Sequence, residues 1–215
     1  MKIKAFPVNP FGENTYIVWN EETRDAVIVD PGMFNDGERK VVDNFIAANN
    51  LNPKYLFLTH MHVDHAMSAN YISHKYSLPV MSAEEEQTLA SRLTEQAAMF
   101  GLGGFYEPVT IDKFVHDGDE FPFGTETIKA IQVPGHSPGG LTFYFKESGF
   151  LLCGDVLFYE SIGRTDLPGG SYEKLVSGIK NKVLALPDDT VIYTGHGEPT
   201  TVGHERNYNG FLGGF

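Results

Sequence analysis

The sequence predicts an α/β fold in which two β-sheets pack face to face and helices cover the outer faces. Three observations support this prediction. Strand-like apolar runs cluster in both halves of the 215-residue chain, helical patterns follow each cluster, and no Ser-rich or low-complexity linker divides the halves. A chain of this length fits one domain, so we expect residues 1–215 to form a single domain.

The first half of the chain alternates short strands with helices. The third strand ends at the turn Asp30-Pro31-Gly32. The first helix is expected to bury Val41, Val42, Phe45 and Ile46, which recur at helical spacing. The strands are expected at residues 3–8, 15–19, 26–29 and 55–58, and the helices at residues 37–49, 66–76 and 84–99.

The second half repeats this pattern with turns rich in glycine and proline. Ser171 is a candidate N-cap for a helix that turns Leu175, Ile179 and Val183 inward. The aromatic-rich segment 100–106 either flanks a cleft or packs a helix against the sheet, and the tail 210–215 is assigned no role. Strands are expected at residues 121–123, 127–133, 141–145, 150–153 and 191–193.

The composition excludes several classes of partner. Acidic residues outnumber basic ones by 28 to 16, and the basic residues form no cluster that would track a nucleic acid. The N-terminus lacks the apolar run of a signal peptide, and no stretch approaches membrane-spanning length. Cys153 is the single cysteine, which excludes an internal disulfide, fits a reducing compartment and favours a buried structural thiol. We therefore expect a cytoplasmic protein.

Residues 59–65, Thr-His-Met-His-Val-Asp-His, directly follow an expected strand. A strand that leads into a tight loop places His60 and His62 on one side, because they lie two positions apart. Asp64 and His65 follow where the loop turns into a helix. Imidazole nitrogens and a carboxylate suit zinc, iron or manganese. A polar loop with unrelated histidines is the alternative, but three histidines and an aspartate this close together favour a metal site.

Three further residues share one context, in which an apolar strand is followed by a turn containing glycine and then by one potential ligand. They are His136, Asp155 and His196. Strand ends at one edge of a sheet are where a fold gathers distant residues into a cleft. Any one of them alone would be read as a turn residue, but their joint occurrence with the histidine-rich loop favours ligands.

The chemistry of these residues predicts two metal sites with a shared ligand. The predicted ligands are His60, His62 and His136 for one ion, Asp64, His65 and His196 for the other, and Asp155 as a bridge. Two cations about 3.5–4 Å apart can share a hydroxide, because together they lower the pKa of bound water toward neutrality. Such a hydroxide is a nucleophile for a carbonyl carbon or a phosphorus. Asp64 is also the predicted catalytic residue, because it can orient this hydroxide by accepting its hydrogen bond.

These residues resemble the metallo-beta-lactamase superfamily, whose motif His-x-His-x-Asp-His stands here at residues 60–65. Asp30, His136, Asp155 and His196 match the other landmarks in order, so the resemblance spans nearly the whole chain. It implies the αββα sandwich, in which two packed mixed sheets carry helices on their outer faces. It also implies that Asp30 has a structural role and is not a ligand.

Within the superfamily, residues 154–158 and the segment Gly163-Arg164-Thr165-Asp166 resemble the glyoxalase II and persulfide dioxygenase branch, which acts on thiol conjugates such as glutathione thioesters. A basic residue nine positions after the bridging aspartate commonly meets the carboxylate of the thiol substrate there, and Arg164 occupies that place. The alternative for Arg164 is a structural salt bridge or turn clamp. Glyoxalase II proper has an added C-terminal helical domain, for which these 215 residues leave no room. The chain therefore resembles the short, single-domain bacterial relatives instead.

The resemblance implies a binuclear metal-dependent hydrolase that cleaves a small-molecule thioester such as an S-2-hydroxyacyl-thiol conjugate by a metal-bridging hydroxide. We expect two divalent ions per chain, zinc first, with iron or manganese as alternatives. A thiolate leaves readily, so no dedicated proton donor is needed. The sequence leaves the thiol carrier and the oligomeric state open.

Two other functions are alternatives to a hydrolase. The first is an oxidoreductase similar to persulfide dioxygenase, with one ferrous iron on His60, His136 and Asp155, a trio that resembles the arrangement of two histidines and one carboxylate in oxygen-activating iron sites. The second is a non-catalytic metal-binding protein, which has little use for an open, bridged site. The missing export signal disfavours a β-lactamase, and the acidic composition disfavours tRNA processing.

Overall fold

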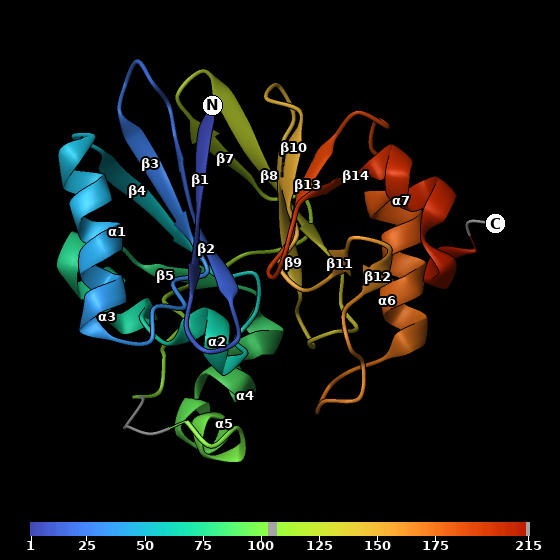
Figure 1. Ribbon diagram of the computed structural model, residues 1–215, viewed down its shortest axis with the longest axis horizontal. Coiled ribbons are helices and arrows are strands. Elements are labelled where there is room, and N and C mark those ends of the chain that lie inside the picture. The colour runs from blue at the N-terminus through green and yellow to red at the C-terminus, as the bar shows by residue number, and fades with distance from the viewer. Residues whose placement is uncertain (103–106, 214–215) are drawn as a thin grey trace. The chain divides into compact units, whose positions relative to one another are not determined.

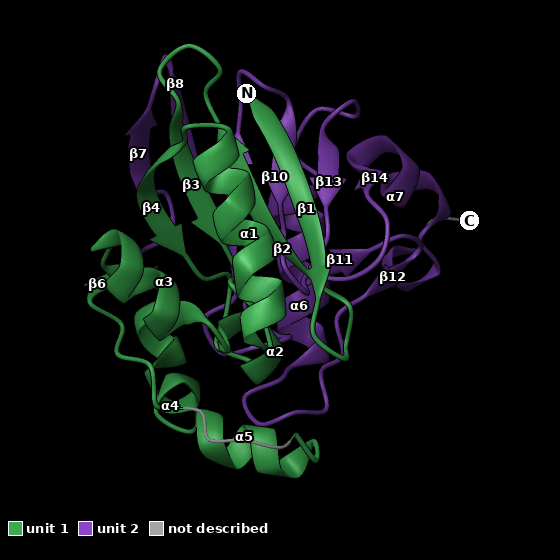
Figure 2. Ribbon diagram, turned by 60° about the vertical axis from the view of Figure 1, so that its left-hand side comes forward, with its two compact units in different colours: residues 1–114 green, residues 115–215 purple. Residues whose placement is uncertain are grey.

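The structure is a computed structural model that describes residues 1–102 and 107–213. The chain divides into two compact units, unit 1 at residues 1–114 and unit 2 at residues 115–215 (Figure 2). The expectation of a single domain stays a prediction. Most of the aromatic-rich segment 100–106, and the end of the tail 210–215, lie outside the described residues.

Unit 1 is built on a mixed six-stranded sheet (Figure 1). Its first three strands pair antiparallel, and the third to the sixth pair parallel. Parallel strands end at the same edge of a sheet, so the residues that follow the third and fourth strands meet there. The strand order is β1 (Lys2–Val8), β2 (Glu13–Trp19), β3 (Asp25–Val29), β4 (Asn52–Phe57), β5 (Val80–Ser82) and β6 (Lys113–Phe114).

Helices α1 (Asp36–Ala48) and α3 (Ala69–Tyr76) pack on the sheet of unit 1 (Figure 1). Val42 and Ile46 of α1 are buried in one apolar cluster with residues of the strands, and Phe45 is partly buried against it. The prediction for Val41 was wrong, because its side chain is 57% exposed. Helical spacing alone does not fix how wide the buried face is.

Both remaining helix predictions in unit 1 had the right location but missed a break. The helix expected at 66–76 begins earlier, as α2 (Val63–Ala66), and is interrupted where the backbone N–H of Ser68 donates to the carbonyl of Pro31. The helix expected at 84–99 is interrupted where the carbonyl of Ala90 accepts from the backbone N–H of Val109. It comprises the 3₁₀ turn η1 (Glu84–Glu86), α4 (Gln87–Ala90) and α5 (Leu93–Met99).

Unit 2 is built on a second mixed six-stranded sheet. The five predicted strands are confirmed within one residue, whereas several strands of two residues were not predicted. The strand order is β14 (Thr200–Thr201), β13 (Val191–Tyr193), β10 (Phe150–Leu152), β9 (Leu141–Phe145), β8 (Glu126–Gln132) and β7 (Glu120–Phe123), and β11 (Leu157–Phe158) and β12 (Ser161–Ile162) form a separate hairpin.

Helices α6 (Tyr172–Gly178) and α7 (Val202–Tyr208) belong to unit 2. The Ser171 side chain accepts from the backbone N–H of Lys174, which confirms the predicted N-cap. Helix α6 continues as the π-helical segment η2 (Ile179–Val183), and the chain forms a last 3₁₀ turn, η3 (Gly210–Leu212). The three residues expected to turn inward are all buried in one cluster with strand residues: Leu175, Ile179 and Val183.

The predicted fold class is therefore confirmed as α/β with two large mixed sheets and helices on both. No described helix is both long and apolar enough to cross a membrane.

Candidate metal centre

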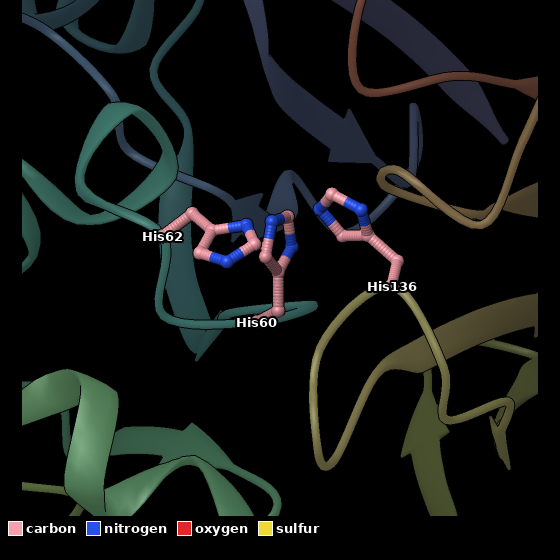
Figure 3. A group of neighbouring side chains, drawn as sticks. All are labelled: His60, His62 and His136. Carbon is pink, nitrogen blue, oxygen red and sulfur yellow. The ribbon is translucent and has the colours of Figure 1, made fainter. Parts of the chain in front are cut away.

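The histidine-rich loop of unit 1 leaves the end of β4 and enters α2. Met61 is fully buried in the apolar cluster, so its neighbours on either side project away from that cluster. The rings of His60 and His62 meet edge to face with centroids 4.7 Å apart (Figure 3). Asp64 and His65 lie in the first turn of α2, and the Oδ2 atom of Asp64 is 3.8 Å from the Nε2 atom of His65. Unit 1 thus gathers four of the seven predicted ligands.

Two buried polar residues that sequence reasoning missed hold this loop in place. The Oε2 atom of Glu86 accepts from the backbone N–H of Met61 at 2.9 Å. Gln96 accepts from the backbone N–H of Val63 at 3.1 Å and donates to the carbonyl of Met61 at 3.1 Å. These contacts satisfy loop groups that would otherwise be unpaired in a buried place. A polar residue on the apolar face of a helix was the only signal in the sequence.

Asp30 lies beside the loop, at the end of β3, and is buried. Its Oδ1 atom accepts from the backbone N–H of Thr59 at 2.7 Å, and its Oδ2 atom accepts from the Thr59 hydroxyl at 2.6 Å. The same Oδ2 atom is 3.0 Å from the Nδ1 atom of His65, and the Thr59 hydroxyl is 3.0 Å from the Nδ1 atom of His60. The implied structural role of Asp30 agrees with these contacts.

Glu13, in β2, is a second buried carboxyl group in unit 1 that sequence reasoning missed. Burial raises the pKa of Glu13 well above its ordinary value, because the charged form of a carboxyl group is poorly solvated there. Its Oε2 atom lies 3.1 Å from the Thr15 hydroxyl oxygen. A side chain added at Gly32 would collide with Glu13 and with the carbonyl of Asp64, so glycine is required there.

The three ligands predicted in unit 2 follow β8, β10 and β13. These strands run in the same direction, because β9 is antiparallel to both of its neighbours and β10 is parallel to β13. Their ends therefore lie at one edge of the sheet. The Oδ2 atom of Asp155 is 3.5 Å from the Nε2 atom of His136 and 3.6 Å from the Nε2 atom of His196. One carboxylate oxygen of unit 2 thus lies near two imidazole nitrogens.

The orientation of the His136 ring is set by the loop after β12. Figure 3 shows His136 on the loop that follows β8. Its Nδ1 atom is 2.8 Å from the backbone carbonyl oxygen of Arg164. A carbonyl oxygen only accepts hydrogen bonds, so Nδ1 carries the proton and Nε2 carries the lone pair. A Cβ at Gly163 would collide with the carbonyl oxygen of Asp155, so only glycine permits this close approach.

The Arg164 side chain is exposed and paired within its own loop. Its Nε and one terminal nitrogen donate to the two carboxylate oxygens of Asp166, each at 2.7 Å. The hydrogen bonds from Arg164 lower the pKa of Asp166 to about 2. This bidentate pair has the geometry expected of a turn clamp, and the role of Arg164 in substrate binding stays a prediction. A substrate carboxylate would have to compete with Asp166 for the same guanidinium.

An open pocket of about 400 Å³ in unit 2 reaches one predicted ligand. It is lined by Phe158, Tyr159, Ser161, His196, Gly197 and Glu198. His204 lies beside it, stacked on the Tyr159 ring at 4.7 Å and within 2.9 Å of a Glu160 carboxylate oxygen, which is a structural, hydrogen-bonded position. Cys153 is buried, as expected for a structural thiol.

The donor atoms suit divalent metal ions. Within unit 1 alone, ligand atoms of Asp30, His60 and His65 lie within 4.8 Å of one another, and all three residues are buried. Neutral imidazole nitrogens and carboxylate oxygens are ligands for zinc, iron and manganese alike, so the set does not select one metal. Each unit gathers its own share of the predicted ligands, and their union in one centre stays a prediction.

Comparisons with known proteins cover the whole chain. The family model described as the metallo-beta-lactamase superfamily matches residues 8–196. The chain is 37% identical to the hydroxyacylglutathione hydrolase GloC of Haemophilus influenzae over 213 residues, which cover 99% of this chain and 98% of that protein.

Two solved structures are similar in both fold and sequence. The first is the BLEG-1 B3 metallo-beta-lactamase, with a TM-score of 0.87 and 34% identity over 98% of this chain and 99% of that one. The second is TTHA1623 in a di-iron-bound form, with a TM-score of 0.85 and 32% identity over 97% of this chain and 100% of that one.

Proposed function

The chain belongs to the metallo-beta-lactamase superfamily, and we propose that it is a binuclear metal-dependent hydrolase that cleaves the thioester of a small thiol. The observation that carries the proposal is the position of Asp155 in unit 2. Its Oδ2 atom lies at nearly equal distances from the Nε2 atoms of His136 and His196, at 3.5 and 3.6 Å. A carboxylate oxygen placed between two imidazole nitrogens is suited to bridge two ions.

We assign the ligands to two ions. His60, His62 and His136 hold one ion, Asp64, His65 and His196 hold the other, and Asp155 bridges them. The matched family region, residues 8–196, includes all seven residues. The di-iron form of TTHA1623, a full-length relative at 32% identity, supports a stoichiometry of two. It also keeps iron beside zinc and manganese as a candidate metal.

The reaction follows from these assignments. Two bound divalent ions would supply a hydroxide at neutral pH and would polarise the thioester carbonyl. The carboxylate of Asp64, with its side chain 16% exposed, accepts a hydrogen bond from the attacking nucleophile and so aims it. The departing thiolate needs no proton from the protein at neutral pH.

The substrate class is argued from the relatives and from the open pocket of unit 2. GloC, at 37% identity over nearly its whole length, is named for the hydrolysis of a hydroxyacylglutathione. The pocket beside His196 offers the aromatic side chains Phe158 and Tyr159 for an apolar part of the substrate. Arg164 is the proposed partner of a substrate carboxylate, in exchange for Asp166.

The test combines metal analysis with a panel of substrates. The full chain is purified, its metals are identified and counted, and turnover is measured with S-lactoylglutathione, a simple neutral thioester and a cephalosporin. Oxygen consumption is measured with glutathione persulfide. Two ions per chain with thioester turnover support the proposal. One iron with oxygen consumption would replace it with a dioxygenase. Turnover of the cephalosporin alone would make the chain a β-lactamase, as BLEG-1 is described.

A further inference from the structure

The hydroxyl group of Thr59 lies between His60, a proposed ligand of one ion, and the carboxylate of Asp30. That carboxylate also contacts His65, a proposed ligand of the other ion. We propose that Thr59 is a positioning residue. Together with Asp30 it forms a hydrogen-bonded relay that fixes which ring nitrogen of His60 and of His65 carries the proton. The link to metal binding rests on the proposed function, whereas the proton positions themselves do not.

The direction of the first hydrogen bond follows from the contacts of Asp30. Its carboxylate accepts from the backbone N–H of Thr59 at 2.7 Å and lies 2.6 Å from the Thr59 hydroxyl. A carboxylate has no proton to give, so the hydroxyl must donate to it. The backbone contact holds the two residues in register, because it anchors the other carboxylate oxygen.

The tautomer of His60 follows from the single proton of the hydroxyl. Once Thr59 donates that proton to Asp30, its oxygen can only accept from the Nδ1 atom of His60, which lies 3.0 Å away. The Nδ1 atom must therefore carry the ring proton. The lone pair is left on Nε2, which is the nitrogen that a metal ion would need.

The tautomer of His65 is set by the same carboxylate oxygen. Its Nδ1 atom lies 3.0 Å from the Oδ2 atom of Asp30 and therefore donates to it. Glu13 is too distant to replace this bond, because its nearest oxygen is 3.8 Å from that nitrogen. The Nε2 atom of His65 is then the ligating nitrogen, on the side of Asp64.

Asp30 itself is held firmly enough to serve two histidines. Its backbone N–H donates to the carbonyl of Phe57 at 3.0 Å, and its carbonyl accepts from the Thr15 hydroxyl at 2.8 Å. Both carboxylate oxygens are occupied by donors of unit 1. Asp30 therefore acts through its histidine neighbours and is not a ligand, even though its carboxylate lies within 4.8 Å of their nitrogens.

The relay predicts a specific effect when the hydroxyl is removed. Thr59→Val keeps the shape of the side chain but leaves the Nδ1 atom of His60 without its acceptor. Loss of a partner behind a metal-binding histidine typically weakens metal affinity by about 10- to 100-fold. Thr59→Ser keeps a hydroxyl group and should therefore keep the wild-type metal affinity.

The experiment uses the full chain and two readouts. In protein treated with a chelator, the ¹⁵N shifts and couplings of the histidine rings report which nitrogen of His60 is protonated. In reloaded protein, competition with a chromophoric chelator gives the zinc affinity. Thr142→Val is the matched control, because the hydroxyl of Thr142 is also buried and donates to the carbonyl of Ile131 in unit 2. Circular dichroism checks that each variant is folded.

We expect His60 to carry its proton on Nδ1 in the wild type, Thr59→Ser and Thr142→Val. In Thr59→Val, His60 should lose this preference, and the zinc affinity should fall by about 10-fold or more. An unchanged His60 tautomer in Thr59→Val would overturn the proposal, and a zinc affinity within 2-fold of the wild type would overturn its link to metal binding. If Thr59→Val does not fold, Thr59→Ala replaces it, because it also lacks the hydroxyl, and an unchanged His60 tautomer there overturns the proposal equally.

The two proposals fail in different ways. Thioester turnover absent from the wild type, with the expected change in the His60 tautomer, would reject the hydrolase and support the relay. Turnover with two ions but no change in the tautomer would reject the relay and support the hydrolase.

Discussion

The Nδ1 atom of His136 lies 2.8 Å from the backbone carbonyl oxygen of Arg164. Arg164 therefore orients a proposed metal ligand through its main chain, while its side chain pairs with Asp166. These two contributions are separable by mutation, because a change of side chain leaves the carbonyl in place. The loop from Gly163 to Asp166 thus has two roles in unit 2 that the sequence motif does not distinguish.

Arg164→Ala should raise KM for thioesters of an anionic thiol, such as glutathione, by about 10-fold or more, because a bidentate pair with the substrate carboxylate is lost. The KM for a short neutral thioester should change far less, and the metal content should stay at the wild-type value. Steady-state kinetics with both substrates check this prediction.

Asp166→Asn is the matched control. If Arg164 binds substrate, releasing it from Asp166 should lower KM for the anionic thioester. If instead Arg164→Ala and Asp166→Asn impair both substrates equally, the pair is a turn clamp and Arg164 is not a substrate ligand.

His62→Ala should remove most of the metal and abolish turnover while the fold persists. Its ring belongs to the loop between β4 and α2 and not to the apolar cluster of unit 1, so its loss should cost metal retention by about 10-fold or more with little change in unfolding temperature. Metal analysis and circular dichroism are the measurements. A folded variant with wild-type metal content and rate would remove His62 from the proposed ligands.

Asp64→Asn should lower the metal stoichiometry from two toward one. The amide is nearly isosteric with the carboxylate but carries no charge, so it binds a cation poorly and no longer accepts as strongly from the nucleophile. Thioester cleavage should fall by about 100-fold or more.

The control for Asp64→Asn is Asp36→Asn, at an exposed carboxylate in the first turn of α1. It should change neither metal content nor rate. Oxygen consumption with a persulfide that survives in Asp64→Asn, together with one iron in the wild type, would contradict the hydrolase.

Asp43→Asn should destabilise the contact between α1 and α3. The Asp43 carboxylate accepts from Lys75, Tyr71 and Tyr76. Burial alone would raise the pKa of Asp43, but these hydrogen bonds outweigh it and lower the pKa. Hydrogen bonds to a charged group contribute about 1.5–3 kcal/mol, so the free energy of unfolding at pH 7 should fall by about this amount.

The pH dependence of that loss has a definite sign. A carboxyl group whose pKa is lowered by folding stabilises the protein above its unfolded pKa, near 3.8, and loses this contribution as the pH falls through the folded value. The difference between wild type and Asp43→Asn in urea denaturation should therefore shrink below pH 3.8. A difference that stays constant from pH 7 to pH 3 would show that lost packing, and not the charge, destabilises the variant.

Much of the fold and of the candidate site is local in the sequence. The strands β9 and β13 and the N-cap at Ser171 were predicted correctly because apolar runs, turn residues and cap chemistry are properties of neighbouring residues. The residues proposed as ligands were found for the same reason. His60, His62, Asp64 and His65 stand within six residues, and His136, Asp155 and His196 each follow a strand and a glycine.

The tertiary structure decided what depends on residues far apart in the chain. The helix expected at 84–99 breaks because the carbonyl of Ala90 pairs with Val109, and Val41 is exposed because the sheet covers a narrower face of α1 than the spacing implied. The contact between Asp30 and Thr59 joins the ends of two parallel strands, 29 residues apart. The local sequence pattern identifies which side chains can bind a metal ion. The hydrogen bonds that orient these side chains form only when distant strands meet at one edge of a sheet.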